Sequence, residues 1–142
     1  MANVSLGGRI SPALDHAVAR SVADGVAYAV AAGNDGADAC DASPAHLPEV
    51  MTVAAVNRND EPASWSNRGP CVDWFAPGVS IRSDWDTSDT ATKTLSGTSM
   101  AAPHAAGAAA VYLGLHPSAT PAEVATALAA AATPGGILQL TG

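Results

Sequence analysis

Apolar residues along this chain fall into two patterns, short continuous runs and longer stretches at helical spacing. Continuous runs bounded by glycine, proline or polar loops are typical of parallel strands buried on both faces. They predict strands at 26–32, 50–56 and 72–78, with a shorter strand at 3–8 that ends in a glycine pair. Because helical stretches separate the strands, we expect a sheet covered by helices.

The helical spacing predicts three helices, at 11–24, 99–115 and 121–131. Ser11 and Thr120 suit the N-caps of the first and last helices, and each is followed by proline at the first helical position. The middle helix is rich in alanine. We expect Pro103 to fit its first turn, where no N–H donor is lost.

Polar segments between these elements are expected to be loops, at 35–49, 57–67 and 83–94. His46, in the first of them, is expected to be exposed at the surface rather than catalytic. A short strand is predicted at 137–140, after the last helix.

Composition narrows the classes of function. The chain has 142 residues, enough for one domain, and its net charge of −7 argues against nucleic acid or an anionic membrane surface as a partner. No apolar run is long enough for a membrane span. The first residues lack the basic and apolar regions of a signal peptide. They begin like a buried strand, so we expect an upstream part to be missing.

Candidate chemistry is concentrated where the middle helix begins. The Gly97-Thr98-Ser99 turn places the Ser99 hydroxyl at a helix N-terminus, a setting that favours developing negative charge and suits covalent acyl transfer. His104 cannot act as the base for Ser99, because five residues along a helix point it about 140° away and roughly 7.5 Å further on. We expect a structural role for His104.

Asn34 follows the predicted strand at 26–32, at a carboxyl end where functional groups gather in α/β sheets. Its amide could stabilise an oxyanion, but spacing alone favours a turn asparagine. Cys40 and Cys71 are too few for a zinc site; from the residues alone they could be free thiols.

The segment 96–107, together with Val4-Ser5-Leu6-Gly7-Gly8 and the region up to about Ala131, resembles the subtilases, the subtilisin-like serine proteases. Within that family it is most similar to the proteinase K and aqualysin branch. The resemblance implies an α/β fold, namely a partial three-layer subtilisin-like arrangement. Its mostly parallel sheet would have flanking helices and lack its N-terminal portion. Residues 1–142 would then be the C-terminal part of a catalytic domain.

The resemblance also implies roles for individual residues. Ser99 matches the nucleophile and Asn34 the oxyanion-hole residue of the family. Two further groups would bind a peptide or protein substrate, by pairing with its main chain and by lining an open pocket for large apolar side chains. These groups are Ser5, Leu6 and Gly7, and Ala31, Ala32 and Gly33.

A disulfide and a metal site are implied in the same way. In the aqualysin-like relatives, cysteines matching Cys40 and Cys71 pair, which implies an oxidising, extracellular compartment. In proteinase K-like relatives a calcium ion lies at positions matching the carbonyls of Pro48 and Val50 and the carboxylate of Asp73.

The chain departs from the family in one respect that bears on catalysis. The His-Gly-Thr and Asp-Thr/Ser-Gly motifs, which carry the base and its partner acid, are absent, and no histidine is followed by glycine. Asp89-Thr90-Ala91 lacks the required glycine. Two hypotheses follow. The chain is part of a serine endopeptidase completed by an upstream segment, or it is an inactive stand-alone fragment or binding module.

Overall fold

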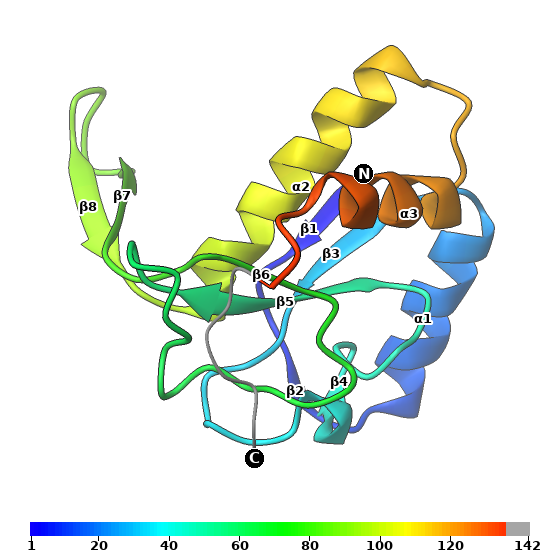
Figure 1. Ribbon diagram of the computed structural model, residues 1–142, viewed down its shortest axis with the longest axis horizontal. Helices are drawn as coiled ribbons and strands as arrows, with labels where there is room; N and C mark the ends of the chain where they lie inside the picture. The colour runs from blue at the N-terminus through cyan, green and yellow to red at the C-terminus, as the bar shows by residue number, and fades with distance from the viewer. Residues whose placement is uncertain (136–142) are drawn as a thin grey trace.

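The continuous apolar runs form one parallel sheet in the computed structural model, which describes residues 1–135 (Figure 1). Its strand order is β1-β3-β5-β6, and all neighbours are parallel. Each strand lies within its predicted range apart from the first, which begins one residue early. The bounds are Ala2–Val4 for β1, Tyr28–Ala31 for β3, Met51–Val56 for β5 and Trp74–Pro77 for β6.

Helices cover both faces of this sheet. Helix α1 (Pro12–Ala23) packs on one face, while α2 (Thr98–Leu115) and α3 (Pro121–Ala131) pack on the other. Side chains alternate across each strand, so Val30 of β3 joins the α1 side, while Ala29 and Ala31 join the α2 side. The α/β class and the mostly parallel sheet expected from the sequence are confirmed.

Small side chains set the spacing between α2 and the sheet. Ala101, Ala102 and Ala109 of α2 are fully buried, and they pack in one cluster with Ala29 and Ala55 of the strands. Because alanine has only a methyl group, the helix axis lies close to the strands. This fixes the beginning of α2 firmly against the carboxyl ends of the strands.

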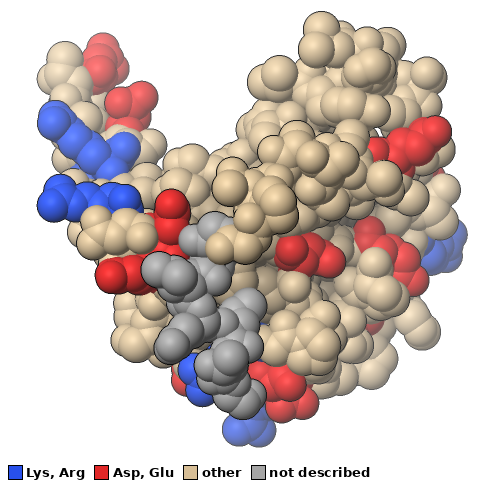
Figure 2. Space-filling model, in the orientation of Figure 1, with Lys and Arg blue, Asp and Glu red and all other residues tan. Residues whose placement is uncertain are grey.

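The opposite side of α2 is apolar and uncovered. The helix contains no charged residue, and Figure 2 shows its outer surface without blue or red atoms. Val111 is 69 % exposed and Leu115 is 76 % exposed. An α-helix that is apolar all round is ordinarily buried, so within residues 1–135 this face of α2 lacks the cover that its composition suits. No helix of that described part is long and apolar enough to cross a membrane.

The expectation of a loop at 83–94 is wrong. Strands β7 (Ile81–Asp84) and β8 (Thr92–Leu95) form an antiparallel hairpin that projects from the body as an arm (Figure 1). Lys93 lies over the Trp85 ring at 4.0 Å, and Arg82 Nε donates to Thr92 Oγ1. Both strands are largely exposed on both faces and lack the alternation of apolar and polar residues that marks a half-buried strand. The sequence pattern therefore did not predict the hairpin.

Three short elements lie between the larger ones. Strands β2 (Gly8–Arg9) and β4 (Ala42–Ser43) pair antiparallel, and a 3₁₀ turn, η1, spans Ala39–Asp41. The predicted strand at 3–8 is therefore split, because β1 ends at Val4. Cys40 and Cys71 form a disulfide with a Cα–Cα distance of 5.3 Å, as the resemblance implied. The strand predicted at 137–140 lies outside the described residues.

His46 is half-buried, so the expectation that it is exposed is wrong. Its Nε2 lies 3.0 Å from Asp15 Oδ2, which also accepts a hydrogen bond from the Ser43 hydroxyl. Burial acts to raise the pKa of Asp15, but the hydrogen bonds from Ser43 and His46 and the charge of His46 hold it below its ordinary value. This cluster ties α1 to the segment that carries β4.

Candidate active site

Ser99 is the second residue of α2, at the end of the helix where main-chain N–H groups have no helical partner. The Ser99 hydroxyl donates to the main-chain carbonyl of Ser5 at 3.1 Å. Among the hydrogen bonds of residues 1–135, no histidine side chain reaches this hydroxyl. The helix N-terminus nonetheless gives Ser99 a local field that favours negative charge beside it.

Asn34 lies beside the same turn and is oriented by Thr98. Its Oδ1 accepts hydrogen bonds from the Thr98 N–H and from the Thr98 hydroxyl, both at 2.9 Å. A main-chain N–H can only donate, so the atom facing it must be the oxygen of the amide. The Nδ2 group of Asn34 therefore keeps its two donors for another acceptor.

Two nitrogen donors lie at similar distances from Gly97. A Cβ atom placed on Gly97 would lie 3.7 Å from Asn34 Nδ2 and 3.7 Å from the Ser99 main-chain nitrogen. Met100 Sδ borders the same space, at 3.6 Å from that Cβ position. The Asn34 amide and the Ser99 N–H are therefore two donor groups that lie close to one another beside the Ser99 hydroxyl.

Asn67 shapes the loop that carries Asn34. Its Oδ1 accepts from the N–H groups of Asp35 and Ala37, and its Nδ2 donates to the Ala32 carbonyl at 2.9 Å. Gly33 has φ +109°, and a Cβ there would lie 2.3 Å from Asn67 Nδ2. A side chain at position 33 would therefore displace the asparagine that holds the loop.

Sequence reasoning gave Asn67 and Thr98 no role. No local signal in the sequence shows that the Asn67 side chain reaches a loop 30 to 32 residues away. Thr98 was visible only as part of the Gly97-Thr98-Ser99 turn. In the structure, its hydroxyl both donates to Asn34 and accepts from the Gly33 N–H at 3.1 Å.

A cavity of about 560 Å³ opens beside Ser99 and collects most of the predicted substrate-binding residues. Arg9, Asp35 and Asp41 add charged groups to its lining. Ser5 is not part of that lining and instead contacts Ser99 directly. The predicted residues that line the cavity are Leu6, Gly7, Ala31, Ala32, Gly33, Asn34 and Ser99.

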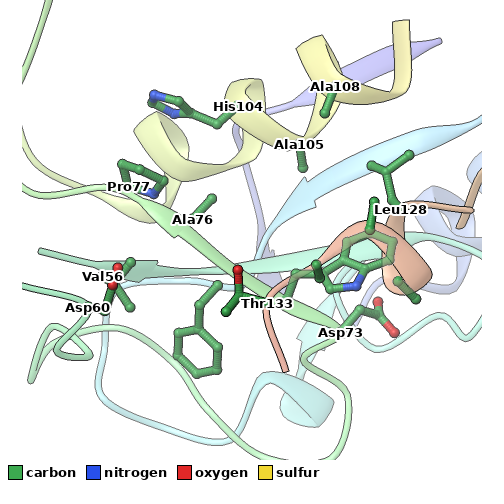
Figure 3. Close-up of a pocket in the computed structure, with 15 residues that line it drawn as sticks. Val56, Asp60, Asp73, Ala76, Pro77, His104, Ala105, Ala108, Leu128 and Thr133 are labelled. Atoms are coloured by element: carbon green, nitrogen blue, oxygen red, sulfur yellow. The ribbon is translucent and has the colours of Figure 1, made fainter. Parts of the chain in front are cut away.

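A second, larger cavity of about 700 Å³ lies between β6, α2 and α3 (Figure 3). Its lining is mainly apolar, with Trp74, Phe75 and Leu128, and it shares no residue with the cavity beside Ser99. His104 borders this larger cavity, and its Nδ1 lies 2.8 Å from the Met100 carbonyl. The imidazole therefore interacts with its own helix.

The residues suggested for calcium lie around the start of β5. Val50 immediately precedes that strand, and Asp73 Oδ2 accepts from the N–H of Thr52, two residues further on, at 2.7 Å. Desolvation raises the pKa of Asp73, against the opposing effect of the Thr52 N–H. No loop or side-chain hydrogen bond to the carbonyls of Pro48 or Val50 is found within residues 1–135.

Carbonyl and carboxylate oxygens are the ligand types that calcium prefers, and a cation beside Asp73 would offset the desolvation of its carboxylate. In the same part of the chain, no three His, Cys, Asp or Glu side chains come close enough together to hold a metal ion.

Comparison with known proteins gives a consistent family. The subtilase family model (Peptidase_S8) matches residues 1–142. The chain is 57 % identical over 132 residues to an extracellular serine proteinase of Thermus sp. (strain Rt41A), covering 93 % of this chain and 32 % of that protein. It is 46 % identical over 142 residues to alkaline serine exoprotease A of Vibrio alginolyticus, covering 100 % of this chain and 26 % of that protein.

A crystal structure of a cold-adapted subtilisin-like serine proteinase superposes with a TM-score of 0.91 at 47 % identity, covering 95 % of this chain and 49 % of that one. The chain therefore spans a third or less of the length of these two curated relatives and about half of the solved structure. The family match over all 142 residues, together with the shared fold, establishes that this chain belongs to the subtilase family.

Proposed function

We propose that this chain forms the C-terminal part of the catalytic domain of a subtilisin-like serine endopeptidase, with Ser99 as its nucleophile. The observation that carries the proposal is that Asn34 Nδ2 and the Ser99 main-chain nitrogen lie at the same distance, 3.7 Å, from a Cβ position on Gly97, beside the Ser99 hydroxyl. The general base and its orienting acid are supplied by a segment outside these 142 residues.

The chemistry follows acyl transfer in two halves. Ser99 Oγ bonds to the carbonyl carbon of the scissile peptide while its proton passes to the base, and the carbonyl oxygen becomes an anion. Asn34 Nδ2 and the Ser99 N–H stabilise that anion. The C–N bond then breaks, and the base returns the proton to the leaving amine. Water next releases the acyl group from Ser99 by the reverse proton transfers.

Substrate alignment is the task of the two groups beside Ser99. The main chain of 5–7 lies outside the strands of the structure, and its groups other than the Ser5 carbonyl, which accepts from Ser99 Oγ, would pair with an extended peptide. Ala31 and Ala32 have small side chains, and Gly33 has none. The cavity they line has room for a large apolar side chain of the substrate.

The partner we propose for the whole domain is the upstream segment that carries the base. Strand β1 pairs only with β3 among the described residues, so its other edge can accept a further strand. The uncharged outer face of α2, with Val111 and Leu115 exposed, gives the same segment an apolar surface to cover. The disulfide and the extracellular relative support location outside the cell.

Calcium is proposed as a structural ion. The carbonyls of Pro48 and Val50 and the carboxylate of Asp73 would hold it, and when bound it would neutralise the partly desolvated carboxylate. Asp73→Asn keeps the size of the side chain and an acceptor for the Thr52 N–H. We expect this variant to lose any calcium-dependent rise in Tm that the unchanged chain has.

Turnover of a chromogenic peptide tests the proposed function. We expect the 142-residue chain alone to show no more than the roughly 10³–10⁴-fold acceleration over water that an oxyanion hole supplies without a base. In the isolated chain, the Ser99 hydroxyl donates its hydrogen to the Ser5 carbonyl and not to a base, which is consistent with low activity.

We call the chain fused to an upstream segment that supplies His-Gly-Thr and Asp-Thr-Gly the joined protein. The joined protein should hydrolyse the peptide, and Ser99→Ala should abolish that activity. Two results would contradict the proposal. One is full turnover by the isolated chain that depends on Ser99, and the other is no turnover by a folded joined protein.

A further inference from the structure

Pro103 lies in the second turn of α2, not in the first as the sequence suggested. Helix α2 begins at Thr98, so the residue at position 103 would normally donate its N–H to the carbonyl of Ser99, four residues earlier. Proline has no N–H, and this helical bond is missing. The carbonyl left without its helical donor belongs to the proposed nucleophile.

The Ser5 hydroxyl takes the place of the missing donor. Ser5 Oγ donates to the Ser99 carbonyl at 2.8 Å, across 94 residues of sequence. In return, Ser99 Oγ donates to the Ser5 carbonyl at 3.1 Å. Each serine therefore gives its hydroxyl to the main chain of the other. Such a reciprocal pair restricts both the distance and the relative rotation of the two segments, whereas one hydrogen bond would allow them to pivot.

Asn3 completes the arrangement from β1. Its Nδ2 donates to Ser5 Oγ at 3.0 Å, which leaves the hydroxyl hydrogen of Ser5 free to point at the Ser99 carbonyl. This bond links the side chain of a β1 residue to the residue that directly follows the strand. The order of donors is therefore fixed, from Asn3 to Ser5 to Ser99.

We infer that the Ser5 hydroxyl is a positioning residue for the nucleophile, and that Pro103 makes this possible by leaving the Ser99 carbonyl without a helical donor. This inference rests on the proposed function for its catalytic meaning. When a base withdraws the Ser99 hydroxyl from the Ser5 carbonyl, the bond from Ser5 Oγ to the Ser99 carbonyl remains. It holds the start of α2 against the segment 5–7 that aligns the peptide.

A double-mutant cycle in the full chain tests the contact without any turnover. Ser5→Ala removes the donor and leaves the Ser99 carbonyl without a partner, so we expect the unfolding equilibrium constant to rise about tenfold. Pro103→Ala supplies a main-chain N–H to the same carbonyl. In that background, Ser5→Ala should change the unfolding constant by less than about twofold.

The ¹³C shift of the Ser99 carbonyl reports the hydrogen bond itself. It should move upfield in Ser5→Ala and return toward its original position in the Ser5→Ala, Pro103→Ala pair. The matched variants Ser5→Thr and Ser5→Val differ only in a hydroxyl against a methyl group, so only the threonine variant should keep the original shift. If Ser5→Ala yields too little folded protein, the threonine and valine pair decides the question.

Steady-state kinetics of the joined protein test whether Ser5 affects catalysis. Per titrated active site, Ser5→Ala should lower kcat about tenfold with a smaller change in KM, because the peptide-pairing main chain is kept. Additive effects in the cycle, or a Ser99 carbonyl shift that is the same in Ser5→Thr and Ser5→Val, would overturn the inference. If the joined protein with Ser5 shows no turnover, the proposed function is refuted instead. The double-mutant cycle and the Ser99 carbonyl shift would then still test whether Ser5 Oγ bonds to that carbonyl.

Discussion

The two cavities of this molecule differ more in their donors than in their size. The larger one, beside β6, has mainly aromatic and aliphatic walls, with Asp60, Asp73 and a histidine that is bonded to its own helix. The smaller one, beside Ser99, is lined by loop glycines and alanines and by an asparagine amide held in place by Thr98. Volume alone would select the larger cavity as the reactive one. Converging donors beside a hydroxyl select the smaller.

The difference has a physical origin in the sheet. The smaller cavity lies where the chain leaves β1 and β3 and enters α2, so main-chain N–H and C=O groups are not used up by regular structure. The larger cavity is lined mainly by side chains of β6, α2 and α3. The proposed chemistry, which needs several fixed donors, is therefore assigned to the smaller cavity.

The largest expected effect separates the two cavities directly. In the joined protein, Asn34→Ala should lower kcat about 10²- to 10³-fold with little change in KM, because its Nδ2 contacts only the developing anion. His104→Ala, in the larger cavity, is the matched control and should change kcat by less than about twofold. Steady-state kinetics on both variants measure kcat of each relative to the unchanged joined protein. A large loss with His104→Ala would reverse the comparison.

Removal of the disulfide should affect stability more than chemistry. Cys40 is the middle residue of η1, near Asp41 at the rim of the smaller cavity, and the bond to Cys71 closes a loop with a sequence separation of 31 residues. Cys40→Ser with Cys71→Ser should lower the free energy of unfolding by about 3–4 kcal/mol in the chain-entropy model. Denaturant titration with and without a thiol reductant measures this. An unchanged midpoint on reduction would contradict it.

A truncation in the larger cavity should show that its role is packing. Leu128 is partly buried against the core that joins α2, α3 and the sheet. We expect Leu128→Ala to lower the free energy of unfolding by about 1–2 kcal/mol, below the range for fully buried leucines. Per folded molecule, kcat should stay within about twofold. A selective loss of kcat with normal stability would assign chemistry to this cavity.

The smallest effect concerns acid stability at the β4 side of the molecule. The pKa of Asp15 is lowered below its ordinary value near 3.8, so its ionised form stabilises the folded state. This contribution is present above the unfolded-state pKa and is lost as the pH falls through the lower folded-state pKa. Asp15→Asn should therefore flatten the decline of unfolding free energy below about pH 4. An identical pH profile for both proteins would exclude this contribution.

The sequence predicted the parallel sheet and its helices because their buried faces follow simple periodicities. Most of the residues that the resemblance to a family implied for the site, Ser99 and Asn34 among them, line the smaller cavity, although spacing alone favoured a turn asparagine at position 34. The hairpin at 81–95 was missed because its strands face solvent on both sides.

Long-range side-chain contacts could not be predicted. The Asn67 side chain reaches a loop 30 residues away. Ser5 Oγ donates to the Ser99 carbonyl, 94 residues away, in place of the N–H that Pro103 lacks. Such pairings depend on how loops come together at the edge of the sheet. No local pattern of apolar and polar residues encodes which side chain meets which carbonyl.

Covalent labelling with a fluorophosphonate tests the central claim most directly, because this probe reacts with a serine only when it is activated as a nucleophile. Peptide mass mapping of the joined protein should locate the adduct on Ser99, with labelling slowed by Asn34→Ala and unaffected by His104→Ala. An adduct on another serine, or none on a folded protein that supplies both the base and its acid, would contradict the assignment of Ser99 as the nucleophile.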